Sequence, residues 1–207
     1  MKCVAISDTH GMYRDIIVPD GDILIHAGDI TRHGHLHELE DFNNWLGEQP
    51  HQHKIIIAGN HDWCFEDTPN ESRSIITNAI YLQDESVTIS GFKFYGSPWQ
   101  PCFFDWAFNL QRGEEIADKW ALIPNDVDVL ITHGPVYGIL DKIITGENVG
   151  CEELKKVIEK ISPKFHICGH IHEGYGTHKF NSVYYINASV NCERYRSINP
   201  AIEFILK

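Results

Sequence analysis

Five short apolar runs along the chain each end in polar side chains. Their length and their β-branched residues predict buried strands. A glycine together with Asp, Asn or His follows each run within a few residues. The runs cover residues Cys3–Ser7, Ile23–Ala27, Ile55–Ala58, Val129–Thr132 and Phe165–Cys168. The pattern therefore predicts strands whose ends carry functional groups.

Helical periodicity separates some of these strands. Apolar residues repeat at helical spacing from Leu36 to Leu46 and again from Leu154 to Ile161. A helix between two strands predicts parallel strands with right-handed crossovers. Further strands are predicted as short antiparallel pieces between Ala79 and Gly96, as a hairpin of Tyr175–Lys179 with Val183–Ile186, and as a last strand from Ala201 to Leu206. We predict a mixed α/β fold that forms a single domain over residues 1–207.

The polar clusters at the strand ends form one coherent set of metal ligands. In an open α/β sheet, ligands bind beyond the carboxyl ends of the strands, so these clusters are expected to converge. Seven nitrogen or oxygen donors are too many for one tetrahedral metal but suit two metals that share a carboxylate. They are Asp8, His10, Asp29, Asn60, His133, His170 and His172. We therefore expect two divalent ions. Because the set contains no cysteine, a structural zinc site is not favoured, and we expect Mn²⁺ as first choice, with Fe, Zn²⁺ or Mg²⁺ as alternatives.

Each polar cluster taken alone has an ordinary structural explanation. Gly28-Asp29 is a common turn, and Asp8-Thr9-His10 could cap a helix. The order of all five clusters and their shared position after strands favour a common site instead. His26 and His166 lie inside strands and are expected to be hydrogen-bonded core residues. The histidines of the crossover between the second and third strands are expected to be solvated: His33, His35, His37, His51 and His53.

Composition narrows the possible partners. The 207 residues carry a net charge of −12, which argues against binding a long nucleic acid. No apolar run approaches the ~18–20 residues that span a bilayer, so no membrane partner is expected. The first apolar run is too short for a signal peptide, and the six cysteines form no C-x-x-C pair. We expect reduced thiols and a cytoplasmic location.

The strand-end motifs resemble those of the calcineurin-like metallophosphoesterase superfamily. The sequence contains the motifs D-x-H, G-D, G-N-H-[DE], a lone histidine and G-H-x-H, in this order, from Asp8 to His172. Longer stretches resemble more narrowly the brain metallophosphoesterase-domain proteins, which are grouped with class III cyclic nucleotide phosphodiesterases. These stretches are Gly91–Trp99, Trp106–Asn109, Thr132–Pro135, His172–Gly176 and Ile186–Ser189. The resemblance implies a four-layer αββα sandwich in which helices flank two packed mixed sheets.

The resemblance also implies a role for each donor. One metal is expected on Asp8, His10, Asp29 and His172, and the second on Asp29, Asn60, His133 and His170. Asp29 then bridges the two ions. His61 and Asn60 are the expected catalytic residues, with His61 facing the substrate as the acid that protonates the leaving group.

This arrangement favours hydrolysis of a small phosphoester. Two metals ~3.5–4 Å apart can activate a bridging hydroxide and hold the phosphoryl oxygens. We expect a phosphodiesterase for small diesters such as cyclic nucleotides. A phosphomonoesterase and a non-catalytic metal-binding scaffold of the same fold are the alternatives. The physiological substrate and the oligomeric state do not follow from the sequence.

One departure from the superfamily bears on the substrate. Protein phosphatases of this kind carry G-D-x-x-D-R-G, whereas Arg32 and His33 replace the second Asp and the Arg here. Protein phosphatase activity is therefore not expected, and Asp62 is only a candidate for orienting His61. The aromatic segment from Trp99 to Trp106 allows two interpretations, a hydrophobic cluster under a loop or a wall of the substrate pocket.

Overall fold

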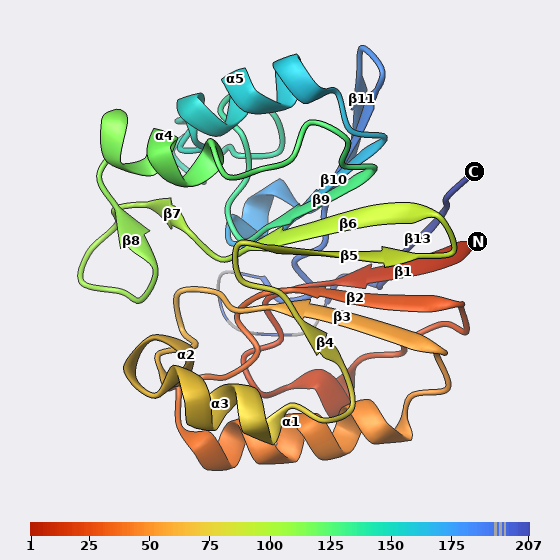
Figure 1. Ribbon diagram of the computed structural model, residues 1–207. Helices are drawn as coiled ribbons and strands as arrows, with labels where there is room; N and C mark the ends of the chain where they lie inside the picture. Colours follow the sequence, from red (N-terminus) through yellow and green to blue (C-terminus); the bar gives the residue numbers. More distant parts are fainter. Residues whose placement is uncertain (193, 195, 197) are drawn as a thin grey trace.

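Two mixed β-sheets form the centre of the computed structural model, which describes residues 1–192, 194, 196 and 198–207 (Figure 1). The first sheet has the order β13-β1-β2-β3-β4. Its strands are β1 (Lys2–Ile6), β2 (Ile23–Ala27), β3 (His53–Ile57), β4 (Ile80–Tyr81) and β13 (Ile202–Ile205). All neighbours in it are parallel except β13, which pairs antiparallel with β1.

The second sheet has the order β11-β12-β10-β9-β6-β5. Its strands are β5 (Glu85–Ile89), β6 (Phe92–Ser97), β9 (Val129–Thr132), β10 (Phe165–Cys168), β11 (Gly176–Phe180) and β12 (Val183–Asn187). The inner strands are parallel, and an antiparallel hairpin closes each edge. A small separate pair, β7 (Gln100–Pro101) and β8 (Asn109–Leu110), flanks the aromatic loop.

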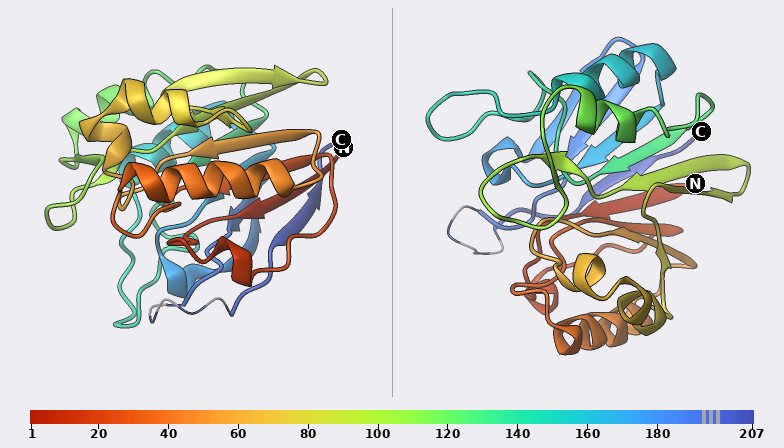
Figure 2. Two further views of the ribbon diagram at one scale, coloured as in Figure 1. Left: turned by 90° about the horizontal axis from the view of Figure 1, so that it is seen from below. Right: turned by 60° about the vertical axis from the view of Figure 1, so that its left-hand side comes forward.

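Helices cover the outer face of each sheet (Figure 2). The first sheet is covered by α1 (Leu36–Glu48), α2 (Cys64–Asp67) and α3 (Pro69–Ile75), and the second by α4 (Glu114–Trp120) and α5 (Glu152–Ile161). Two short 3-10 turns, η1 (Tyr13–Asp15) and η2 (His172–Gly174), complete the elements. The predicted four-layer α/β sandwich is confirmed.

The strands bury both faces, which explains their nearly continuous apolar sequence. In β1, Val4 and Ile6 face the helices of the first layer, while Cys3 and Ala5 face the opposite sheet. In β9 the same alternation turns Leu130 outward and Ile131 inward. Burial of apolar surface on both faces fixes the register, because a slip by one residue would exchange the two faces of a strand.

The predicted elements lie close to the observed ones, with one error in pairing. Both predicted helices, the C-terminal hairpin and the last strand are present within a few residues. Between Ala79 and Gly96, however, only β5 and β6 are antiparallel, and β4 joins the first sheet parallel to β3. Tyr81 explains this placement, since it packs against Phe65 of α2 in the first outer layer and thus draws β4 to that sheet.

The parallel strands of both sheets end at the same side of the molecule. Figure 1 shows β1, β2, β3, β9 and β10 with their carboxyl ends together, away from the two chain termini. The termini lie next to each other, where the Met1 amino group donates to the Leu206 carbonyl at 3.0 Å. The five polar clusters that follow these strands are therefore brought to one edge of the sandwich.

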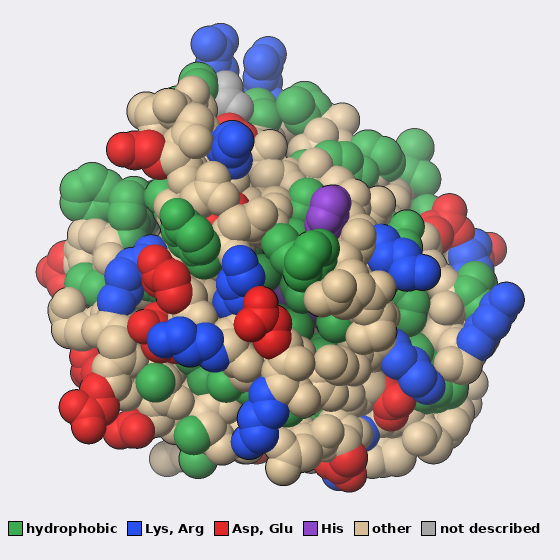
Figure 3. Space-filling model, turned by 90° about the horizontal axis from the view of Figure 1, so that it is seen from above, with side chains coloured by type: hydrophobic (Ala, Val, Ile, Leu, Met, Phe, Trp, Pro, Cys, Tyr) green, Lys and Arg blue, Asp and Glu red, His purple; other side chains and the backbone are tan. Residues whose placement is uncertain are grey.

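The surface over α4 and α5 carries charges of both signs (Figure 3). Lys and Arg side chains are interspersed there with Asp and Glu, and hydrophobic side chains lie between them. Within the described residues, no helix has the length and apolar character needed to cross a membrane.

Candidate metal centre

Several of the predicted ligands adopt a backbone conformation that is unusual for their residue type. Asp8, His10, Asp29 and His170 have φ values of 55°, 45°, 55° and 66°. This left-handed region is uncommon for residues other than glycine, and such strain concentrates at functional sites. These four residues follow the ends of β1, β2 and β10, so the strain lies at the edge of the sandwich where the polar clusters gather.

Glycines beside these residues make room for the side chains. A Cβ atom on Gly169 would lie 2.1 Å from Oδ2 of Asp8, and one on Gly59 would lie 2.4 Å from Oδ1 of Asp29. Any larger residue at either position would displace a carboxylate. The glycine in each of these two motifs is thus required by the close approach of backbone and ligand.

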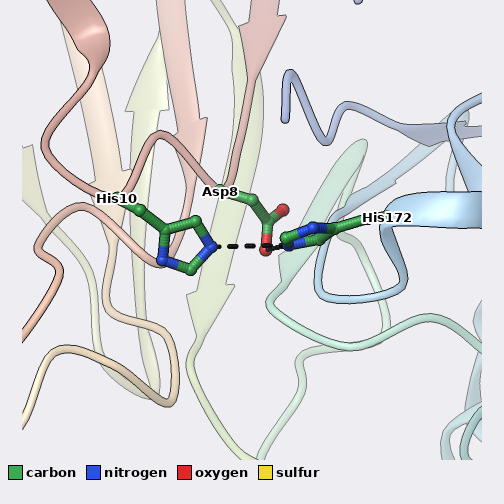
Figure 4. Close-up of side chains that lie close together, drawn as sticks. All are labelled: Asp8, His10 and His172. Carbon is green, nitrogen blue, oxygen red and sulfur yellow. Dashed lines mark hydrogen bonds and ion pairs between the residues drawn. The ribbon is translucent and has the colours of Figure 1, made fainter. Parts of the chain in front are cut away.

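Asp8, His10 and His172 form the first group of donors (Figure 4). One ligand atom from each lies within 4.8 Å of the other two. The Nε2 atoms of His10 and His172 are 3.4 Å apart, and Nε2 of His172 lies 3.4 Å from Oδ1 of Asp8. These side chains come from the loop after β1 and from η2, so opposite ends of the sequence meet here.

Asp29 lies between this group and a second one. Its Oδ2 is 3.7 Å from Nε2 of His10, and its Oδ1 is 3.4 Å from Nε2 of His133. Oδ1 of Asn60 lies 2.9 Å from the same His133 nitrogen. His170 reaches the second group through its ring, whose centroid is 5.0 Å from that of His133. Asp29 thus has one oxygen toward each group.

The carboxylates stay ionised despite their burial. Burial alone would raise the pKa of Asp8, but the hydrogen bond and charge of His172 outweigh it and lower the pKa. Burial would likewise raise the pKa of Asp29, but the charge of His133 outweighs it, and the pKa is lowered. Burial would lower the pKa of His133 and His172, yet Asp29 and Asp8 raise it to about 9 in each case. Each carboxylate thus holds a positive charge beside it, and a divalent ion that binds here would displace the proton of the neighbouring imidazole.

Two strand histidines support the ligands from behind. Nε2 of His26 lies 2.9 Å from Oγ1 of Thr9, between Asp8 and His10. Nε2 of His166 lies 2.7 Å from Oγ1 of Thr132, next to His133. Burial lowers the pKa of both histidines to about 3, which keeps them neutral. Both are hydrogen-bonded core residues, as predicted.

The predicted solvation of the crossover histidines is wrong at one position. His33 and the residues around it are accessible to solvent, but His51 is buried, and its Nε2 lies 3.0 Å from the Pro19 carbonyl oxygen. The charge and polarity of the crossover sequence do not predict this contact, because it depends on how residues 16–22 pack against His51.

His61 lies at the edge of both groups and is 8% exposed. Its backbone N–H donates to Oδ1 of Asp29 at 2.8 Å. Its Nδ1 is 3.0 Å from the carbonyl oxygen of Arg32, which can only accept, so Nδ1 carries the proton. One of its ligand atoms also falls within 4.8 Å of donors on His10 and Asp29.

Asp62 supports the turn and does not orient the His61 ring. Its carboxylate accepts from the backbone N–H groups of Ile30, Thr31 and Gly59 at 3.1, 2.8 and 2.8 Å, and from the Thr31 hydroxyl at 2.8 Å. It therefore joins the turn after β2 to the turn after β3. The role considered for Asp62 belongs to the Arg32 carbonyl, a backbone group that no sequence motif identifies.

Asp8 has a supporting partner that sequence reasoning missed. The Ser189 hydroxyl donates to Oδ2 of Asp8 at 2.8 Å, and the His170 N–H donates to both carboxylate oxygens at 3.0 Å. The side-chain amide of Asn191 donates to the Asp8 carbonyl at 2.7 Å. The sequence pattern could have identified these partners, because polar residues also follow the predicted strand Val183–Ile186. This is a sixth strand that ends at the same edge.

A cavity of about 460 Å³ opens over the site. His10, Asp29, Asn60, His61, His170 and His172 line its polar part. Apolar residues line most of the rest, including Phe103, Trp106, Pro135, Ile143, Ile144 and Ile171, and Arg112 and Glu173 add two charged side chains. Of the two interpretations of the aromatic segment, the pocket wall applies to Phe103 and Trp106, whereas Trp99 packs against the core.

The donors present fit a divalent metal centre. They are two ionised carboxylates, an amide oxygen, and imidazoles that are either neutral or carry a proton that a metal ion can displace. Such a set is suited to Mn²⁺, Fe or Zn²⁺. Burial lowers the pKa of His10 to about 4 and that of His170 to about 3, which leaves neutral imidazoles ready to bind metal. The donors also cluster at strand ends, with glycines beside the two carboxylates, and this arrangement too fits a metal centre.

Fold and donor set together define a metal-binding protein of the layered α/β class, and comparison with known proteins specifies the family. Residues 1–174 match the model of the calcineurin-like phosphoesterase family, and the chain belongs to that family. The family uses divalent metals and acts on phosphoesters. The resemblance predicted from the strand-end motifs is thereby confirmed.

Curated relatives cover nearly the whole chain. Metallophosphoesterase domain-containing protein 1 of Homo sapiens is 45% identical over 97% of this chain and 69% of its own length. The UPF0046 protein K07C11.7 of Caenorhabditis elegans is 40% identical over 100% of this chain and 76% of its own length. Among solved structures, the phosphopantetheinyl hydrolase of Mycobacterium tuberculosis superposes with a TM-score of 0.64 at 16% identity, over 94% of this chain and 90% of that one. At this identity the last comparison shows a shared fold.

Asp62 provides a test of how the two turns are held. Asp62→Ala removes the acceptor of four hydrogen bonds and leaves buried donors without a partner. We expect a loss of about 2–5 kcal/mol in the free energy of unfolding, measured by urea denaturation. Asp67→Ala, an exposed acid in the following helix, serves as the control and should change stability by less than about 0.5 kcal/mol. Equal stability of the two variants would contradict the bridging role.

Proposed function

We propose that this protein is a phosphodiesterase that acts on small phosphodiesters with two divalent ions, Mn²⁺ as first choice. Asp8, His10, Asp29 and His172 hold one ion, and Asp29, Asn60, His133 and His170 hold the other. The observation that carries the proposal is the position of Asp29, with one oxygen toward His10 and the other toward His133. When bound, the ions supply an activated water and neutralise phosphoryl charge.

The chain's own residues complete the chemistry. The cavity directly adjoins His61, whose Nδ1–H is held by the Arg32 carbonyl. In the imidazolium form, Nε2 can give its proton to a leaving alkoxide, and the ring is left neutral with its proton on Nδ1. Asn60 places its amide oxygen next to His133 and precedes His61 in the same turn. The apolar walls of the cavity exclude water from the leaving group. They also strengthen the charge interactions between the substrate and the polar part of the cavity.

The charge of the cavity supports a diester over a monoester. Arg112 is the one Lys or Arg among the described lining residues, and its guanidinium already donates to the carbonyls of Val149 and Gly150 and pairs with Glu152. Arg32 does not line the cavity. A monoester dianion would lack the extra cationic contacts that it needs, whereas a diester carries a single charge.

A scaffold without activity is the competing proposal. It predicts incomplete metal loading, since a scaffold has no need for a full ligand set. Protein purified without chelator and reconstituted with Mn²⁺ should contain two equivalents by elemental analysis, and fewer than one would favour the scaffold. We further propose a cytoplasmic location, which the six free cysteines support.

Substitution of Asp29 tests directly whether one carboxylate serves both metal ions. Asp29→Ala should lower the affinity for both ions and reduce diester turnover by about 10³-fold or more, because both groups lose a ligand. Asp8→Ala should mainly empty one position. Asp118→Ala, an exposed residue of α4 outside the cavity lining, is the control for a lost carboxylate. Metal titration followed by elemental analysis measures the result, and two tightly bound ions in Asp29→Ala would refute the bridging assignment.

His170 and His172 test the division of the ligands. His170→Ala should weaken the position that also uses Asn60 and His133, and His172→Ala the position that uses Asp8 and His10. Anomalous scattering from crystals of each variant shows which ion is lost. If both variants lost the same ion, the division would be wrong.

His61 tests the substrate class and the acid role together. His61→Ala should keep its metals and lower kcat/KM for cyclic nucleotides and other unactivated diesters about 10²–10⁴-fold. For p-nitrophenyl diesters, whose leaving group needs no proton, the loss should be much smaller. His37→Ala, a histidine on α1, is the control. Equal losses on both diesters would contradict the acid role, and faster turnover of simple monoesters than of every diester would overturn the substrate class.

A further inference from the structure

The loop between β7 and β8 is fastened to the turn that carries His61. The Ala107 N–H donates to the carbonyl of Asn60 at 3.2 Å, and the Phe108 N–H donates to Oε2 of Glu66 at 2.6 Å. Phe108 is 1% exposed and packs in the first outer layer. The loop thus crosses from the second sheet to the edge of the first sheet and stops beside the candidate catalytic histidine.

Two residues of this loop adopt strained backbone conformations. Phe104 and Phe108 have φ values of 51° and 56°, a region that bulky side chains rarely occupy. The strain persists because β7 and β8 and the contacts of Ala107 and Phe108 hold both ends of the loop. Trp106 lies between the two strained positions and is half-buried.

Trp106 stacks on the ring of His61. The ring centroids are 4.3 Å apart, and the ring planes are inclined by 29°. His10 contacts the same imidazole edge-on at a centroid distance of 4.5 Å and an angle of 77°. The His61 ring is therefore enclosed by an indole face and by a neighbouring ligand.

The stack adds a second restraint on the His61 ring. The contact of Nδ1 with the Arg32 carbonyl positions one ring nitrogen within the tolerance of a hydrogen bond. An indole plane packed on the imidazole reduces the remaining range of ring tilt and thereby the range of directions of Nε2. Positioning of a reacting group matters because a displacement of about 1 Å can cost roughly 10²-fold in rate.

We propose that Trp106 is a positioning residue, which holds the plane of the His61 ring so that Nε2 faces the leaving group of the substrate. The proposal rests on the proposed function, since it assigns Trp106 to the acid step of that reaction. It differs from the role of a simple pocket wall, in which Trp106 would contact the leaving group and affect substrate binding.

The test compares two diesters in the wild-type protein and its variants. Trp106→Ala should lower kcat for an unactivated diester about 10- to 100-fold and leave kcat for a p-nitrophenyl diester nearly unchanged, because only the first needs the acid. Trp106→Phe retains an aromatic face and should recover most of the loss. In the His61→Ala background, Trp106→Ala should cause no further decrease. Phe104→Ala, on the same loop and 77% exposed, is the matched control.

Each other outcome has a definite meaning. Equal losses on both diesters, or a further loss in the His61→Ala background, would show that Trp106 acts on the substrate or on the loop, and would overturn the proposal. A rise in KM at constant kcat would do the same.

Stacking of Trp106 on His61 can be measured independently of activity. In protein loaded with diamagnetic Zn²⁺, the part of the ring-current shift that the indole imposes on the His61 protons should disappear from NMR spectra of Trp106→Ala and persist in Phe104→Ala. A wild-type protein that shows this shift but hydrolyses neither diester would refute the proposed function while the stack stands. An active wild-type protein in which the His61 protons are unshifted would refute the positioning role alone.

Discussion

The burial of two ionised carboxylates is the constraint on which the rest of this structure depends. Asp8 and Asp29 are almost inaccessible to solvent, and a buried charge is costly unless opposite charge and hydrogen bonds compensate it. His172 and His133 supply the charge, and backbone N–H groups of His170 and His61 supply hydrogen bonds. A cluster held this way has an excess of electron-pair donors directed at a common space, which suits divalent ions.

Bringing those groups together requires local conformations that a polypeptide would otherwise avoid. The left-handed backbone at Asp8, Asp29 and His170 costs conformational energy, and the close approach of carboxylates to backbone is possible only at glycines. The two-sheet core stabilises the whole arrangement, because strands buried on both faces give a rigid base for their ends. Strain is therefore concentrated at the edge where the sheets present their ligands.

The aromatic loop connects the two halves of the sandwich at the same edge. Phe108 anchors it in one outer layer, and the Ala107 contact with Asn60 links it to the turn that carries His61. Trp106 consequently belongs both to the wall of the cavity and to the surroundings of His61. One loop, distant from His61 in the sequence, thus contributes to the substrate environment and to the surroundings of the proposed acid.

The sequence by itself determined the mixed α/β class and which polar side chains gather at one edge, because buried parallel strands have a continuous apolar signature and their polar ends must meet there. The layered arrangement of the sheets followed from the family resemblance of the strand-end motifs. It also separated His26 and His166 from the ligands by their place inside strands. Only the tertiary structure decided the parallel pairing of β4, the burial of His51, the use of the Arg32 carbonyl for His61 and the contact of Ser189 with Asp8. These features depend on backbone atoms and on contacts between distant segments, and neither leaves a residue pattern that periodicity or motif spacing can detect.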